Sequence, residues 1–175
     1  LHRPGVFSCA SVGMRVELRG EASHAAEPEA ARSPMAALAR LLSDFSQAPP
    51  PDRDATGFLT VTHARLGSPS FGITPGFATL FATIRAPGML ELESLCRDAT
   101  ERVEAVSRGA GLDLVLRWHD AFPSTESADD LVSTLAQVCE DREIPAALLP
   151  LPFRWSEDFG HFAGSCETLY FGLGA

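Results

Sequence analysis

The sequence predicts an α+β fold with two helices on one face of an antiparallel sheet, followed by a fragment of an α/β sheet. Two observations lead to this prediction. Between residues 12 and 118, the periodic segments follow the order strand, helix, strand, strand, helix, strand, which is the split βαβ or ferredoxin-like arrangement. After His119 the composition changes, and a polar stretch leads to a further helix and a terminal apolar segment.

Alternation of apolar and polar residues predicts four strands in the first part of the chain. It marks residues 12–20, 58–66, 77–85 and 112–118. The loop at residues 67–76 is rich in turn-forming residues. The second and third strands are therefore expected to be antiparallel neighbours.

Apolar residues spaced three and four positions apart predict two helices. The first is expected at residues 34–46, where Ser33 can cap the amino end. The second begins at Met89 and ends near Gly109. The proline-rich stretch at residues 48–55 can be neither a helix nor a central strand.

The residues after the fourth predicted strand indicate part of a second unit. A helix is expected at about residues 130–141, with Ser127 or Asp129 as its cap. Ser156 is a candidate cap for another short helix, and residues 168–173 have the composition of a buried strand. A unit that ends on a buried strand is expected to belong to a larger α/β sheet.

Three segments follow from this reading of the chain. Residues 1–10 are expected to be the remnant of an upstream domain. Residues 11–120 form the ferredoxin-like domain, and residues 121–175 are an incomplete part of an α/β domain.

Charge and composition argue against several classes of function. The net charge is −9 and the isoelectric point is near 4.9, so nucleic acid and anionic membrane are not expected as partners. No run of 18 apolar residues and no signal-peptide pattern occurs, which favours a cytoplasmic protein. The four cysteines lie far apart, which argues against a redox motif or a zinc knuckle and favours a reducing compartment.

One histidine, His24, lies in a polar loop between the first predicted strand and the first predicted helix. Its neighbours are Ala22, Ser23, Ala25 and Ala26. These small side chains leave room for another molecule to approach the imidazole. On this stretch alone, a solvent-facing histidine without a function is the simpler interpretation.

Three stretches of the chain resemble a superfamily of two-zinc amidohydrolases that includes aminoacylase, hippurate hydrolase and glutamate carboxypeptidase. Residues 20–42, GEASHAAEPEAARSPMAALARLL, are similar to the histidine loop and following helix of its dimerisation domain, also called the lid. Residues 60–85, TVTHARLGSPSFGITPGFATLFATIR, look like paired strands of the same domain. RWSEDFGHF at residues 154–162, with TLYFGLGA at residues 168–175, resembles a segment of the catalytic domain. The lid of this family is ferredoxin-like, in agreement with the predicted order.

The resemblance implies a metal-dependent hydrolase that cleaves an amide bond of an N-acyl amino acid or a related small substrate, as a homodimer through the lid. In this family two divalent metal ions, most often zinc, activate a water molecule, and a glutamate acts as the general base. His24 matches a lid histidine that stabilises the oxyanion in the active site of the partner subunit. Arg85 matches an arginine that meets the substrate carboxylate or supports the interface. His2 matches a metal ligand of the family.

The sequence also departs from the family pattern. At most one of about five family metal ligands is present, so the chain by itself is expected to be catalytically inert. His2 stays open as a ligand because its segment lacks one residue of the family motif, and Arg85 could be a simple strand-end charge. Glu157 and Asp158 match the family's SEDF motif without being metal ligands there, and a helix start explains them equally well. Where the family often has asparagine, residues 71–74 read FGIT. The alternative function is a non-catalytic dimerisation or small-ligand-binding module.

Overall fold

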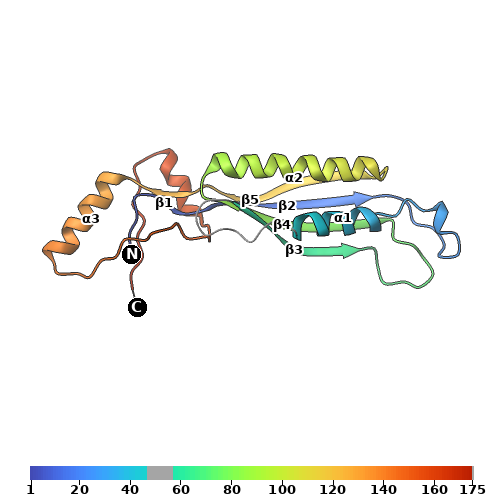
Figure 1. The fold of residues 1–175 in the computed structure, drawn as a ribbon, viewed down its shortest axis with the longest axis horizontal. Coiled ribbons are helices and arrows are strands. Elements are labelled where there is room, and N and C mark those ends of the chain that lie inside the picture. Colours follow the sequence, from blue (N-terminus) through green and yellow to red (C-terminus); the bar gives the residue numbers. More distant parts are fainter. Residues whose placement is uncertain (47–56, 175) are drawn as a thin grey trace.

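A computed structural model describes residues 1–46 and 57–174, which form an elongated molecule (Figure 1). The two ends of the chain lie on the same side of the molecule as α3, whereas the loops that follow β2 and β3 form the opposite tip. The elements are β1 (Gly5–Ser8), β2 (Ala10–Arg19), η1 (Pro28–Ala30), α1 (Met35–Ser46), β3 (Phe58–Leu66), β4 (Phe77–Ala86), α2 (Met89–Gly109), β5 (Asp113–Phe122), β6 (Thr125–Ser127), α3 (Asp129–Asp141) and η2 (Asp158–Gly164).

The main sheet has four strands in the order β3-β4-β2-β5, and all neighbouring strands are antiparallel. With α1 and α2 this gives the β-α-β-β-α-β order, so the ferredoxin-like prediction is confirmed. β2 is a central strand and pairs with β4 without interruption, from Ala10 opposite Ala86 to Arg19 opposite Phe77. β3 and β5 are the edges of this sheet.

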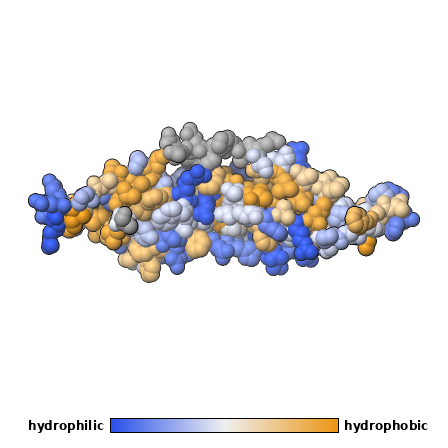
Figure 2. Space-filling model, turned by 90° about the horizontal axis from the view of Figure 1, so that it is seen from below, coloured by the Kyte–Doolittle hydropathy of each residue, from blue (hydrophilic) through white to orange (hydrophobic). Residues whose placement is uncertain are grey.

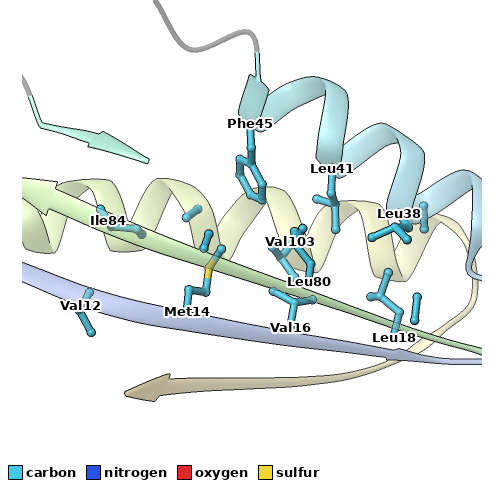
Figure 3. Close-up of a cluster of buried hydrophobic side chains, with 14 of the residues drawn as sticks. Val12, Met14, Val16, Leu18, Leu38, Leu41, Phe45, Leu80, Ile84 and Val103 are labelled. Carbon is cyan, nitrogen blue, oxygen red and sulfur yellow. The ribbon is translucent and has the colours of Figure 1, made fainter. Parts of the chain in front are cut away.

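The core lies between one face of the main sheet and the helices α1 and α2 (Figure 3). Alternate side chains of β2 and β4 point toward the helices, as the period of two in a strand requires. The residues of β2, β4, α1 and α2 that Figure 3 labels are all buried: Val12, Met14, Val16, Leu18, Leu38, Leu41, Phe45, Leu80, Ile84 and Val103. Both long helices of the described lid residues, α1 and α2, therefore lie on the same face of the sheet.

Two local features fix the loop between β2 and α1. The Ser33 hydroxyl accepts a hydrogen bond from the Met35 amide at 3.4 Å, which confirms the predicted cap of α1. Gly20 lies against the Arg32 backbone, and an added Cβ would overlap the Arg32 carbonyl oxygen. Glycine is therefore required where this loop closes on itself, between the bridged residues Glu21 and Arg32.

A second, smaller unit brings both chain ends together. Its two-stranded sheet pairs β1 with β6 in antiparallel fashion, and the amino group of Leu1 donates to the Gly172 carbonyl at 2.8 Å. Contacts between aromatic rings hold this unit together, at centroid distances of 5.1–6.3 Å, and they join Phe7, Phe153, Trp155, Phe159, Phe162 and Tyr170.

The strand predicted at residues 168–173 is wrong. This segment lies in no sheet of the described residues, and Phe171 and Leu173 are 43% and 88% exposed. Its backbone groups instead form hydrogen bonds with the first residue of the chain and with a side chain. The Gly172 amide donates to the Leu1 carbonyl, and the Tyr170 amide donates to the Ser127 hydroxyl.

The predicted caps of α3 and of the last short helix are also wrong. Ala128 occupies the N-cap of α3 without a side-chain bond, because the Ser127 hydroxyl is bonded to the Tyr170 backbone. Glu157, rather than Ser156, caps η2 by accepting from the Phe159 amide. The Ser156 hydroxyl instead accepts a bond from Arg85.

No helix in residues 1–46 and 57–174 is long and apolar enough to cross a membrane. The proline-rich connection predicted at residues 48–55 lies outside the described residues.

Candidate functional site

His24 lies at the tip of the molecule, in the loop between β2 and α1 (Figure 1). This loop is paired with the loop between β3 and β4. The Ser23 amide donates to the Thr74 hydroxyl at 2.8 Å, and the Thr74 amide donates to the Ser23 carbonyl at 2.9 Å. The Ala25 amide donates to the Gly72 carbonyl at 3.0 Å. These bonds give the exposed histidine a defined backbone position.

Within residues 1–46 and 57–174, the imidazole of His24 has one hydrogen bond. Its Nδ1 accepts from the Ala26 amide at 3.1 Å. A nitrogen that accepts a hydrogen bond carries no proton, so in the neutral ring the proton lies on Nε2. The ring is exposed, and this arrangement leaves Nε2 as a donor for a molecule outside the chain. Such a donor suits an oxygen on which negative charge develops.

His2 lies in the smaller unit, far from the tip. Its amide donates to the Ala147 carbonyl at 3.1 Å, and its carbonyl accepts from the Leu149 amide at 2.8 Å. Its Nδ1 is buried and has no hydrogen-bond partner in the described part of the chain. An orphaned buried nitrogen is suited to a ligand that the chain does not provide.

The described residues do not build a metal centre. Within residues 1–46 and 57–174, no group of three His, Cys, Asp or Glu side chains is placed to hold a metal ion. His2 is one candidate ligand, whereas zinc sites in enzymes use three protein ligands or more. A two-metal site does not fit the residues described in this chain.

Arg85 lies at the end of β4 and joins the main sheet to the segment at residues 154–156. Its Nη1 donates to the Ser156 hydroxyl at 2.8 Å and to the Arg154 carbonyl at 3.4 Å. The Arg154 guanidinium lies 4.2 Å from the centroid of the Phe58 ring on β3. Neither Ser156 nor Arg154 was identified from the sequence as a partner of Arg85. The SEDF motif drew attention to the segment that contains Ser156. The contact with Arg85 itself could not be predicted, because the two residues are 71 positions apart and no local sequence pattern connects them.

The Cys9 thiol is buried next to this junction. Burial raises the pKa of Cys9, while the positive charges of Arg85 and Arg154 act in the opposite direction. A raised thiol pKa lowers the thiolate fraction, so Cys9 is suited to packing rather than to nucleophilic chemistry.

Glu157 has a structural role in the fold. Its Oε1 accepts from the Thr125 hydroxyl at 2.7 Å, and its Oε2 accepts from the Phe159 amide at 3.1 Å. Both carboxylate oxygens are therefore used to hold β6 and η2 together. Asp158 is exposed in the first turn of η2.

A buried carboxylate, Glu17, is paired with two partly exposed arginines on the face of the main sheet opposite α1 and α2. Glu17 is 5% exposed, and its carboxylate accepts from Arg15 at 2.7 Å and from Arg19 at 2.6 Å. The hydrogen bond from Arg19 is the main cause that lowers the pKa of Glu17, with further lowering by the charge of Arg15. The sequence pattern did not identify this group as a site, and nothing in its geometry calls for a ligand because both oxygens are paired.

Comparison with known proteins identifies the fold family. Residues 9–111, more than half of the chain, match the peptidase dimerisation domain of the M20 family. The chain belongs to this family. The match covers β2, α1, β3, β4 and α2, so the lid predicted by resemblance is confirmed.

One curated relative and two solved structures illustrate this relationship. The chain is 33% identical over 110 residues to succinyl-diaminopimelate desuccinylase from Paracoccus denitrificans, a match that covers 61% of this chain and 28% of that protein. Aminopeptidase PepT from Bacillus cereus has a TM-score of 0.78 at 17% identity, over 97% of this chain and 45% of its own. A dinuclear metal-binding M20 peptidase from Bacillus subtilis has a TM-score of 0.73 at 13% identity, and the match covers 95% of this chain and 41% of that protein. The chain thus spans less than half the length of these relatives.

Proposed function

We propose that this chain is the lid and part of the catalytic domain of a homodimeric, metal-dependent M20 amidohydrolase. Its substrate is an N-acyl amino acid or a related small amide. The observation that carries the proposal is the position of His24, whose Nε2 is left as a donor. Its loop follows Arg19 at one end of the main sheet, whereas Arg85 is paired with Ser11 near the other end. The family membership supports hydrolytic chemistry.

The proposal divides the chain into three segments. Residues 1–10 and residues 121–175 belong to the catalytic domain, and residues 11–120 are the lid. The smaller unit presents an apolar surface, seen in orange in the left half of Figure 2. Exposed apolar patches mark sites of interaction, and we propose that the remainder of the catalytic domain covers this one. The large exposed apolar side chains of the smaller unit include Ile144, Leu148, Trp155, Phe162, Phe171 and Leu173.

The length of the sheet separates His24 from the residues of its own subunit. Arg85 is paired with Ser11 near the start of β2, whereas the His24 loop follows Arg19 at the other end. A strand of ten residues spans about 30 Å at about 3.3 Å per residue. A rigid lid therefore cannot bring His24 to Arg85 of the same chain. We propose that His24 serves the active site of the partner subunit.

We assign three roles to side chains of this chain. His24 donates from Nε2 to the oxygen that gains negative charge when the amide carbonyl is attacked. Arg85, oriented by Ser156, binds the carboxylate of the substrate. His2 is a candidate metal ligand through its orphaned Nδ1. The complete enzyme is proposed to use two divalent metal ions, most simply zinc, and this chain alone is proposed to be inert.

The dimer interface is proposed to lie on α1 and the edge strand β3. An edge strand presents unpaired backbone groups that can pair with a second copy. α1 contacts β3 and exposes Met35, Ala36 and Ala39 beside it. The segment that matches the dimerisation domain ends before the other edge strand, β5, which supports this choice. The four free cysteines support a cytoplasmic location.

Mixed dimers of the full-length protein test the proposal. His24→Ala is expected to lower kcat by roughly 10²–10³ with little change in bound metal. When His24→Ala and Arg85→Ala subunits are mixed, each mixed dimer holds one intact site, built from Arg85 of one subunit and His24 of the other. Random mixing is expected to restore about a quarter of the wild-type activity.

The control is Glu27→Ala, an exposed side chain in the same loop, which is expected to leave kcat unchanged. No recovery in the mixed dimers would show that His24 acts within its own subunit. A full-length protein that binds no metal and hydrolyses no amide would favour the non-catalytic dimerisation or small-ligand-binding module. An unchanged kcat in His24→Ala would instead contradict the role proposed for His24.

A further inference from the structure

We infer that Phe71 and Ile73 form an apolar wall over the partner's active site and select substrates with an apolar group on that side. This inference rests on the proposed function, because it needs the tip of one subunit to reach the site of the other. The substrate class is an amide with an aromatic or branched aliphatic acyl group, as opposed to one with a second carboxylate.

Ile73 lies beside His24. The two residues form an antiparallel bridge between the loops of the tip. Residues directly opposite one another in an antiparallel pair point to the same face, with Cβ atoms about 5 Å apart. A group that receives a hydrogen bond from His24 therefore meets the Ile73 side chain next to it. Ile73 is 60% exposed, so most of its surface is available to such a group.

Phe71 completes the wall and is fully exposed in the single chain. A solvent-exposed aromatic ring does not contribute to the core of its own subunit. Contact with an apolar group is favourable for such a ring because it removes apolar surface from water. The bond from the Ala25 amide to the Gly72 carbonyl, at 3.0 Å, ties the position next to Phe71 to the position next to His24. Ile73 also lines a hollow of about 340 Å³ with Ser68, Ser70 and Pro75, which leaves space beside the wall.

The charges at the tip disfavour an acidic acyl group. Of the two arginines near the tip, Arg32 is paired with the Glu21 carboxylate at 2.9 Å, whereas Arg65 lines the hollow and donates from Nε to the Gly67 carbonyl at 3.1 Å. Glu29 adds an exposed negative charge to the His24 loop. A carboxylate at this position would meet repulsion and an apolar surface.

The test compares two substrates of the full-length homodimer that share one amino acid and differ in the acyl group, N-benzoyl and N-succinyl. The wild type is expected to favour the N-benzoyl substrate. Phe71→Ala and Ile73→Ala are expected to lower kcat/KM for N-benzoyl by roughly 10- to 100-fold, and for N-succinyl by less than about 3-fold. The matched control is Leu90→Ala, an exposed apolar residue of α2, which is expected to change neither value.

Mixed dimers show which subunit supplies the wall. In the pair of His24→Ala and Arg85→Ala subunits, the intact site takes its tip from the Arg85→Ala chain. Phe71→Ala on that chain is expected to lower activity on N-benzoyl, whereas Phe71→Ala on the His24→Ala chain is not.

Several outcomes would overturn the inference. Equal losses on both substrates, a loss that does not depend on which subunit carries Phe71→Ala, or dissociation of the Phe71→Ala dimer would each refute the wall while leaving the proposed function intact. Failure of the wild-type protein to hydrolyse either substrate would instead refute the proposed function and this inference together.

Discussion

The guanidinium of Arg85 and the hydroxyl of Ser156 meet at 2.8 Å, and this bond joins the last residues of β4 to the segment that precedes η2. Arg154 lies in the same segment and covers the Phe58 ring of β3. The junction therefore uses two arginines, one from each side, to connect the lid to the smaller unit.

Arg85→Ala is expected to weaken both the junction and substrate binding. Loss of a charged hydrogen bond in a half-buried site destabilises by about 1–2 kcal/mol, and loss of the carboxylate partner is expected to raise KM by roughly 10-fold or more. Thermal unfolding and steady-state kinetics of the full-length protein measure the two effects. Arg97→Ala, an exposed arginine of α2, serves as the control. A raised unfolding free energy with normal KM would contradict both roles.

Much of the lid could be predicted from the sequence because its signals are local. The alternation Val12, Met14, Val16, Leu18 reports one buried face of a strand, and the spacing of apolar residues in α2 reports one buried face of a helix. The order of these elements then leaves few possible arrangements. The cap at Ser33 was predicted for the same reason, since it involves a residue two positions away.

The smaller unit could not be predicted equally well because its contacts are between distant residues. The segment at residues 168–173 has the composition of a strand, but its backbone bonds go to Leu1, to the Ala128 amide and to the side chain of Ser127. Arg85 was recognised as a candidate, whereas its partner Ser156 was assigned to a cap. The bridge between His24 and Ile73 likewise depends on the pairing of two loops, which no periodicity reports.

Ala39→Glu on α1 is expected to weaken the homodimer. Ala39 is exposed on the helix that lies next to the edge strand β3, and a charged side chain there would have to be buried between the two subunits. We expect the dimer dissociation constant to rise by 10-fold or more, measured by light scattering across a concentration series. Leu90→Glu on α2 is the matched control and is expected to leave the dimer intact. A monomeric wild-type protein would contradict the proposed assembly directly.

Glu17→Gln is expected to reduce stability at neutral pH and to lose this effect in acid. The hydrogen bond from Arg19 and the charge of Arg15 hold the pKa of the folded carboxylate below the ordinary value for glutamate. A lowered pKa contributes stability above the unfolded pKa, and the contribution disappears as the pH falls through the folded pKa. Denaturant unfolding of both proteins should therefore give a difference at pH 7 that shrinks progressively below about pH 4.5. A difference that stays constant down to pH 3 would mean that packing, rather than charge, explains it.

Gly20→Ala is expected to displace the loop that carries His24. An added methyl would overlap the Arg32 carbonyl oxygen and come within 2.8 Å of the Leu112 side chain, so the bridge between Glu21 and Arg32 would have to open. We expect a loss of about 2–4 kcal/mol in unfolding free energy and a kcat close to that of His24→Ala. Gly72→Ala in the facing loop is the matched control, because no atom lies within 4 Å of its added methyl. Its expected effect is between zero and a gain of about 1 kcal/mol, since alanine restricts the unfolded chain. If both variants behaved alike, the close approach at Gly20 would not be what holds the loop.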